Sequence, residues 1–213
     1  ELTKVYRQSD QDFIDLLNAI RNADVDAIDF EKLNERYDPE FEPKEKSYVY
    51  LTSHNKMADA INQKKLQELP GTSQFYPASI VGDFKETQYP CETNLELKVG
   101  AQIMFIRNDA SGEKRYFNGK LAVVQSLSED AIKVIIEGTD SIYTLKKEVW
   151  EQKAYSLDQN KNIKEDVLGS FEQYPIRLAW AVTIHKSQGL TFENVIIDAG
   201  KSFVSGQVYV ALS

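Results

Sequence analysis

The chain has 213 residues, of which 42% are hydrophobic, and carries a formal net charge of −8. This composition is typical of a globular protein with one large domain or two small ones, and it excludes wholesale disorder. The negative balance excludes a nonspecific nucleic-acid binder that works by bulk positive charge, and the single cysteine excludes a disulfide framework or a multi-cysteine metal site.

The first 46 residues predict an extended segment, two helices and an acidic loop. Leu2–Gln8 is expected to be extended, and Ser9 or Asp10 then caps a helix. Phe30–Tyr37 predicts a weaker helix, and the proline-containing acidic run Asp38–Lys46 predicts a solvated loop. The first helix is predicted from apolar residues at helical spacing: Phe13, Ile14, Leu16, Leu17 and Ile20.

A strand, a polar turn and a helix follow. Tyr48–Thr52 predicts a strand, Asn55 is expected to cap a helix from Lys56 to Leu69, and Pro70–Gly71 ends that helix. This order is half of a βαβ unit, in which ligand-contacting groups lie at the carboxyl end of the strand. Thr52 and Asn55 are therefore candidate contacts, although a strand end and a helix cap would explain them equally well.

From Thr72 the sequence predicts short strands separated by turns. This spacing indicates a small antiparallel barrel between about Gly82 and Lys164. Asn118–Lys120 is a candidate special turn, and a tight turn without a ligand role is the simpler interpretation. The predicted strands are 80–84, 97–106, 121–127, 132–136, 141–145 and 149–155.

The most informative stretch is Trp180–Phe192, where hydrogen-bonding side chains are packed between two apolar segments. The apolar run Asn194–Asp198 follows and predicts a buried strand, so the polar residues form a turn between buried elements. The alternative is purely structural: a capped helix with His185 as a core residue. The polar group comprises Thr183, His185, Lys186, Ser187 and Gln188, and Gly189 closes it.

Thr183–Thr191 resembles motif V of the superfamily 1 DNA helicases, in the form found in the class B branch of the Pif and RecD helicases. Gly206–Ser213 is similar to the start of motif VI, and Tyr6–Gln8 with the helix after it resembles motif IV. Leu97–Met104, followed by Phe117–Lys120, resembles the SH3-like barrel that these helicases insert into their second motor domain.

The resemblance implies an α/β fold: a RecA-like parallel-sheet domain, the second motor domain, with an inserted SH3-like β-barrel. On this basis residues 1–71 and 171–213 form the two parts of the motor domain, and residues 72–170 form the β-rich insertion. We expect Val49–Leu51 and Val195–Ile197 to lie in one parallel sheet, because both are short apolar runs bordered by turns.

The resemblance also implies roles for single residues. Arg7 would be the catalytic arginine that reaches the γ-phosphate of ATP, as suits a guanidinium whose charge does not titrate away. Gly189 and Gln207 would face the nucleotide with it. The single strand would be held by Thr52, Asn55, Thr183, His185, Lys186, Ser187 and Gln188.

The phosphate-binding loop of the nucleotide-binding domain, Gly-x-x-x-x-Gly-Lys-Ser/Thr, has no match in this chain. The resemblance therefore implies that a first motor domain of the same protein binds most of the ATP and Mg²⁺, and that this chain alone does not hydrolyse ATP. The opening Glu1, in place of Met, leads us to expect a piece of a longer protein.

The resemblance implies that the full protein is an ATP-dependent helicase. This helicase would translocate 5′ to 3′ on single-stranded DNA, unwind duplex DNA and act as a monomer. We expect no membrane partner and an intracellular location: cytoplasm or nucleoid in a bacterium, nucleus or mitochondrion in a eukaryote. Two other functions stay open: a non-catalytic module that binds nucleic acid or protein, and a plain structural domain.

Overall fold

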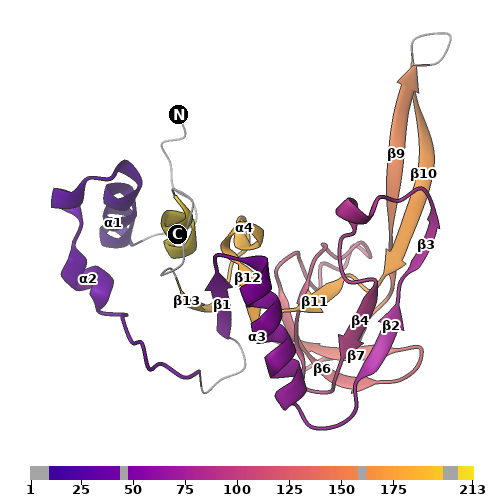
Figure 1. Ribbon diagram of the computed structural model, residues 1–213, viewed down its shortest axis with the longest axis horizontal. Helices are drawn as coiled ribbons and strands as arrows, with labels where there is room; N and C mark the ends of the chain where they lie inside the picture. Colours follow the sequence, from indigo (N-terminus) through magenta and orange to yellow (C-terminus); the bar gives the residue numbers. More distant parts are fainter. Residues whose placement is uncertain (1–9, 44–47, 158–161, 199–205) are drawn as a thin grey trace.

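The centre of the computed structural model, which describes residues 10–43, 48–157, 162–198 and 206–213, is a small parallel sheet (Figure 1). Its strand order is β12-β1-β13, with β1 at Tyr48–Thr52, β12 at Ala181–Thr183 and β13 at Asn194–Ile197. Both outer strands run parallel to β1. The prediction that residues 49–51 and 195–197 lie in one parallel sheet is confirmed, and the two strands are neighbours in it, but β13 is only partly buried.

Two helices, α3 and α4, contact the strands of this sheet. Helix α1 spans Gln11–Asn22, and the Asp10 carboxylate accepts a hydrogen bond from the Phe13 N–H, as the sequence predicted for a cap. Helix α2 spans Phe30–Asn34, so it ends three residues before the predicted end at Tyr37. The other helical elements are η1 at Val25–Ala27, α3 at Asn55–Glu68, η2 at Glu86–Gln88, α4 at Ile184–Ser187 and α5 at Gln207–Leu212.

The cap of α3 was predicted wrongly. The N-cap residue is His54, and Asn55 is the first residue of the helix itself. No side chain caps this helix end, so the Asn55 amide is not used in holding the helix start. The exposed Asn55 side chain therefore lies near the carboxyl end of β1 and is available for other contacts.

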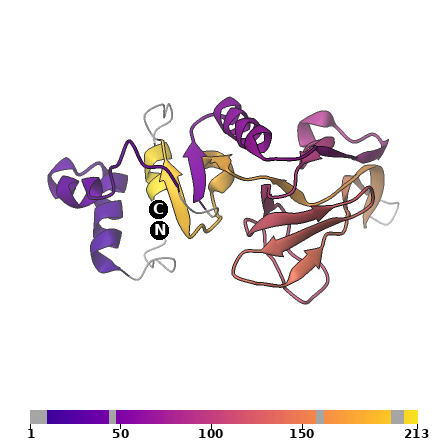
Figure 2. The same ribbon diagram turned by 90° about the horizontal axis from the view of Figure 1, so that it is seen from below.

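The other strands of the described residues pair antiparallel. A five-stranded sheet has the order β11-β5-β6-β7-β8, a three-stranded sheet the order β3-β10-β9, and β2 pairs with β4 (Figure 2). The strands are β2 Gln74–Pro77, β3 Ser79–Gly82, β4 Asn94–Leu97, β5 Gln102–Phe105, β6 Leu121–Leu127, β7 Ile132–Ile136, β8 Ile142–Thr144, β9 Glu148–Leu157, β10 Ile163–Gln173 and β11 Ile176–Leu178.

Two features of this region differ from expectation. The predicted strand 97–106 is divided, because the chain turns at Gly100, whose φ of +86° favours glycine, before β5 begins. The pairings among the described residues leave β8 and β11 as the edges of an open sheet, so a closed barrel is not seen. Strand β11 lies in residues 171–213, which were expected to form part of the motor domain. It nevertheless pairs with β5 in the antiparallel sheet.

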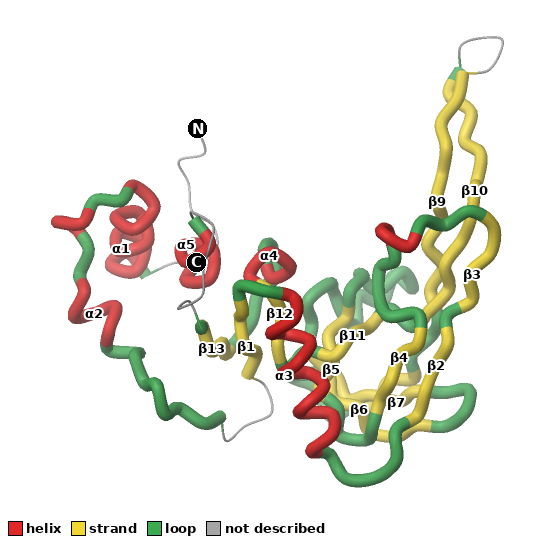
Figure 3. Tube along the Cα trace, viewed as in Figure 1, coloured by secondary structure: helices red, strands yellow, loops and turns green. Residues whose placement is uncertain are grey.

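Strands β9 and β10 form a long hairpin that extends well beyond the rest of the antiparallel region (Figures 1 and 3). At the base of the hairpin, β10 also pairs with β3. Several of its apolar side chains are exposed, among them Tyr155 and Ile163. The hairpin is therefore a two-stranded ribbon over most of its length rather than part of the packed core.

The parallel and antiparallel regions share their hydrophobic cores. Leu66 of α3 packs into the core of the antiparallel region. In the other direction, Met104 of β5 and Leu121 of β6 are buried in the cluster beneath the parallel sheet, together with Val49 and Val182. Because each region fills part of the other's core, the two are held together by burial of apolar surface.

No helix in the described ranges is both long enough and apolar enough to cross a membrane. Within the same ranges, no cluster of three His, Cys, Asp or Glu side chains is arranged to hold a metal ion.

Candidate nucleic-acid interface

Two turns leave the parallel sheet side by side. Thr52 ends β1 and Thr183 ends β12, and the two are register partners. Both side chains are almost fully buried, with 1% and 5% exposed. The Thr52 hydroxyl donates to the His54 carbonyl at 3.2 Å, and the Thr183 hydroxyl accepts from the Lys186 N–H at 3.4 Å. The threonines thus organise their own turns.

The remaining predicted DNA contacts divide into one buried residue and four exposed ones. Ser187 is buried, and its hydroxyl donates to the Ile184 carbonyl at 2.8 Å. The exposed group comprises Asn55, His185, Lys186 and Gln188. His185 is therefore not a core histidine. The structure brings together four polar side chains that are available to a ligand, and three buried ones that hold the backbone beneath them.

The predicted nucleotide-facing residues are less fully placed. Arg7 lies outside the described residues. Gly189 follows the polar turn with a φ of +87°, and the space that a Cβ would occupy there is open. Gln207 is buried as the first residue of α5, directly after Gly206. The nucleotide side therefore stays a prediction from the motifs.

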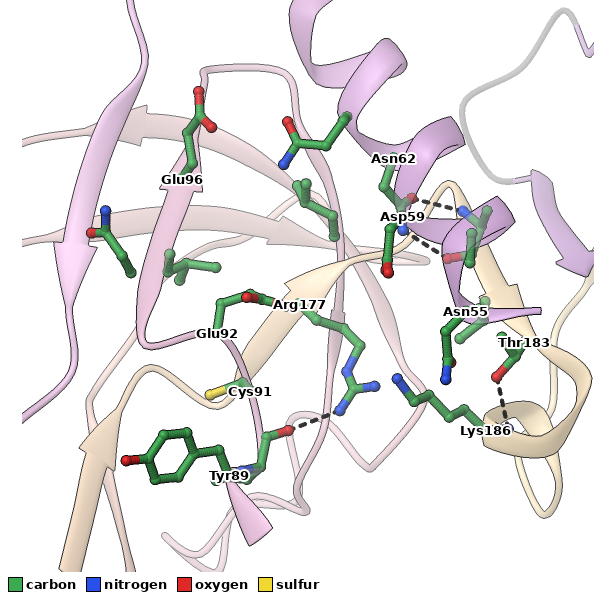
Figure 4. Close-up of a pocket in the computed structure, with 18 of the residues that line it drawn as sticks. Asn55, Asp59, Asn62, Tyr89, Cys91, Glu92, Glu96, Arg177, Thr183 and Lys186 are labelled. Carbon is green, nitrogen blue, oxygen red and sulfur yellow. Dashed lines mark hydrogen bonds between the residues drawn. The ribbon is translucent and has the colours of Figure 1, made fainter. Parts of the chain in front are cut away.

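A cavity of about 590 Å³ opens beside the exposed side chains, between α3, the segment 89–96 and the strands β11 and β12 (Figure 4). Asn55, Thr183 and Lys186 line one end of it. Its volume is in the range of small-molecule and cofactor sites. We refer to this cavity as the cleft; it lies between the helix that covers the parallel sheet and the antiparallel region.

The sequence prediction missed Asn62, which positions one wall of the cleft. Its amide donates to the Ala181 carbonyl at 2.9 Å and accepts from the Ala181 N–H at 2.8 Å. Strand β12 is an edge strand, so this side chain satisfies backbone groups that no further strand pairs. The signal was present: Asn62 lies in the buried face of α3 between Ala58 and Leu66, at helical spacing.

The antiparallel region also touches the polar turn directly. Gly119, in the turn before β6, has a φ of +99° and packs against Leu190, which follows Gly189. A Cβ at Gly119 would lie 2.9 Å from Leu190 Cδ2, closer than two carbons approach. The turn at Asn118–Lys120, for which the sequence favoured a tight turn without a ligand role, thus packs against the loop that follows the exposed side chains.

The cleft is also lined by Cys91, which is partly buried. Burial raises the pKa of the Cys91 thiol to about 12, although the nearby Arg177 lowers it. A thiol with this pKa carries almost no thiolate at neutral pH, and the thiolate is the reactive form. We therefore do not expect Cys91 to act as a nucleophile at neutral pH.

No family model matches the chain. Curated proteins do match it. The human ATP-dependent DNA helicase PIF1 is 32% identical over 222 residues, which cover 100% of this chain and 33% of the human protein. The chain is thus similar to Pif1 helicases over its whole length. It spans about a third to a half of the length of the Pif1 relatives it matches.

Solved Pif1 structures are also similar to this chain. Unliganded Pif1 from Bacteroides sp. is 36% identical, with a TM-score of 0.87 over 98% of this chain and 48% of that chain. Pif1 helicase from Bacteroides in complex with ADP-AlF3 and single-stranded DNA is also 36% identical, with a TM-score of 0.72 over 99% of this chain and 48% of that chain. The mixed α/β arrangement described above is thus that of Pif1.

Proposed function

We propose that this chain is the second motor domain, RecA-like in fold and carrying an SH3-like insertion, of an ATP-dependent helicase that moves 5′ to 3′ on single-stranded DNA. The Pif1 complex with ADP-AlF3 and single-stranded DNA supports both ligands. The parallel sheet, with its polar turns at the carboxyl ends of adjacent strands, supports the assignment of the motor domain.

The observation that carries the proposal is the exposed polar group at that edge of the sheet. Lys186 supplies a positive charge, His185 a ring that can stack or donate, and Asn55 and Gln188 supply amide donors. Donors of this kind suit phosphate and sugar oxygens and carry little base information. The expected grip is therefore independent of DNA sequence, as translocation along a strand requires.

The nucleotide side of the proposal involves a partner domain. A first motor domain of the same protein would hold ATP and Mg²⁺ on its phosphate-binding loop, and Arg7, Gly189 and Gln207 would face that nucleotide from this chain. Closing and opening of the two domains around ATP would then move the strand between them. Since α4 and α5 lie against each other, a shift at Gln207 would reach the polar turn.

The test is His185→Ala in the full-length protein. His185 is exposed, so we expect the melting temperature to stay unchanged while single-strand affinity falls by ~1–3 kcal/mol, the range measured for stacking contacts. Single-strand-stimulated ATP hydrolysis should fall with it. Affinity is measured by fluorescence anisotropy with a labelled oligonucleotide, and the melting temperature by calorimetry.

Ser187→Ala is the matched control, because Ser187 is the buried neighbour whose hydroxyl donates to the Ile184 carbonyl. It should lower the melting temperature more than His185→Ala does. If His185→Ala leaves single-strand affinity intact and destabilises the fold, the residue is structural and the proposed grip is wrong.

A further inference from the structure

Arg177 is the one basic residue in the apolar run from Pro175 to Val182. It lies on β11, and its guanidinium donates to the Pro90 carbonyl at 2.9 Å. Its Nε is buried and has no hydrogen-bond partner among the described residues. One face of the guanidinium is thus fixed against the segment 89–96, while the side chain lines the cleft.

A second cation meets it there. Figure 4 shows the side chains of Arg177 and Lys186 pointing toward one another across the cleft, from β11 and α4 respectively. None of the ion pairs between described residues involves either of them. Two cations that face each other repel, so this arrangement favours an anion between them.

The cleft also contains acids, which restrict where an anion can lie. Asp59 and Glu92 line it. Burial lowers the pKa of Arg177, whereas the carboxylates of Glu92 and Asp59 raise it and so help to keep the guanidinium charged. An anionic ligand is therefore expected between Arg177 and Lys186, and excluded from the acidic wall.

The chemistry of the cleft favours a phosphate that belongs to a nucleic-acid strand. A guanidinium presents a planar fork of donors that matches phosphate oxygens. Phe75, which is 56% exposed, lines the same cleft, and an exposed aromatic ring in a groove that also carries cations can stack an unpaired base. A free phosphate ion would make no use of that ring.

We propose that Arg177 and Lys186 together bind one backbone phosphate of the single strand, and that the strand continues along the cleft toward Phe75 on the antiparallel region. The inference rests on the proposed function but extends it. The strand leaves the edge of the parallel sheet through a defined phosphate site, and Arg177, from β11, becomes a DNA contact.

The experiment is Arg177→Gln in the full-length protein, with Lys64→Gln as control. Lys64 is a 78%-exposed residue of α3 that does not line the cleft, so this control makes the same change in charge. We expect Arg177→Gln to weaken single-strand binding about 10-fold, the loss typical of one charge-assisted hydrogen bond. The slope of log affinity against log salt should shrink by roughly 0.7, as for one lost phosphate contact on a single strand.

A second measurement separates contact from structure, because Arg177 also holds Pro90. Oligonucleotides that carry a single neutral methylphosphonate linkage are scanned through the binding site. In the wild-type protein one linkage position should weaken binding about 10-fold, and Arg177→Gln should remove the sensitivity at that position. If the scan is the same in both proteins, or the salt slope is unchanged, Arg177 is only a structural clamp and the inference is wrong.

Inorganic phosphate distinguishes the source of the phosphate. If it stabilises the wild-type protein against heat but not Arg177→Gln, while both bind the strand equally, the site takes a free anion and the assignment to the strand is overturned. Failure of the proposed function looks different, since the full-length wild-type protein would then not bind single-stranded DNA. Loss of binding on His185→Ala with none on Arg177→Gln contradicts this inference alone.

Discussion

The parallel and antiparallel regions differ in how they are stabilised. The antiparallel region has a continuous core in which Leu97, Ile103, Phe105, Ile132 and Ile176 are fully buried. The cluster beneath the parallel sheet is smaller, and its outer strand β13 is only partly buried. That cluster also takes two of its buried residues from β5 and β6.

This difference shows that the region with the candidate contacts depends on its neighbour. The polar turns lie on a three-stranded sheet, and three connections support them from outside: the Asn62 amide, the Gly119 turn and the buried Met104 and Leu121. The last two connections come from the antiparallel region, which therefore helps to hold the candidate site in place. Changes at these connections should affect the site more than equally conservative changes elsewhere.

The largest effect is expected at the connection between α3 and β12. Asn62→Ala leaves the Ala181 N–H and carbonyl buried without partners, and each such group costs about 1–3 kcal/mol. The free energy of unfolding should fall by about 2–4 kcal/mol in urea titration. Gln63→Ala, at the exposed neighbouring position, should change it by less than about 0.5 kcal/mol.

Single-strand binding by the Asn62→Ala protein sharpens the result. Because Asn62 holds the strand that ends at Thr183, we expect weaker binding at temperatures where the protein is still folded. Equal stability of the Asn62→Ala and Gln63→Ala proteins would contradict the dependence of β12 on α3.

The second connection is tested by two glycines that both have positive φ. Gly112→Ala, at φ +84° with open space around it, should cost only the backbone strain of ~1–2 kcal/mol. Gly119→Ala, at φ +99° and against Leu190, adds a steric clash and should cost roughly 1–2 kcal/mol more.

Leu190→Ala decides whether the clash accounts for the extra cost. In the Leu190→Ala protein, Gly119→Ala should lower the free energy of unfolding only by the backbone strain that Gly112→Ala also causes. The Leu190 side chain, against which the new methyl group would clash, has been removed. The free energies of unfolding of the wild type, the two single variants and the double variant complete a double-mutant cycle. Additive effects would show that the turn does not support the loop after Gly189.

The smallest effect concerns a charge where the two regions meet. Burial raises the pKa of Glu137; Lys120 lowers it and Glu193 raises it. Since the folded-state pKa is above the unfolded one, stability is lost as pH rises from the unfolded value through the folded one. Glu137→Gln removes this loss, so it should raise the melting temperature at pH 8 by at most about 3 °C and at pH 4 by almost nothing.

Glu113→Gln provides the comparison for Glu137, because the Glu113 side chain is 67% exposed. The Glu113→Gln protein should have the same melting temperature as wild type at both pH 4 and pH 8. If Glu137→Gln instead lowers the melting temperature below that of wild type at pH 8 but not at pH 4, the ion pair with Lys120 outweighs the cost of burying the carboxylate.

Local pattern was sufficient for much of the fold. The bounds of β1, β6 and β7 follow from their apolar runs, and α1 from its helical spacing and the Asp10 cap. Pairing between distant strands is not a local property, so neither the place of β11 beside β5 nor the open edge at β8 could be predicted. The break at Gly100 was missed because apolar residues flank it on both sides.

The sequence predicted which residues form the candidate site, but not which of their side chains are exposed. The polar string from Thr183 to Gln188 was found, yet which of its members are buried depends on hydrogen bonds formed after folding. Asn62 and Arg177 are single polar residues in apolar patterns, and their partners, Ala181 and Pro90, are about 90 to 120 residues away. Only the tertiary structure identifies those partners.

The shared parallel sheet has a consequence for how the chain folds. Tyr50 and Ala181 are register partners but are separated by about 130 residues, whereas the strands of the antiparallel region mostly join near neighbours in sequence. Closing a loop of that length in an unfolded chain is entropically costly and slow. If the antiparallel region forms first, it brings β1 and β12 close together. The turns at Thr52 and Thr183 would then assemble last, after synthesis has passed β13.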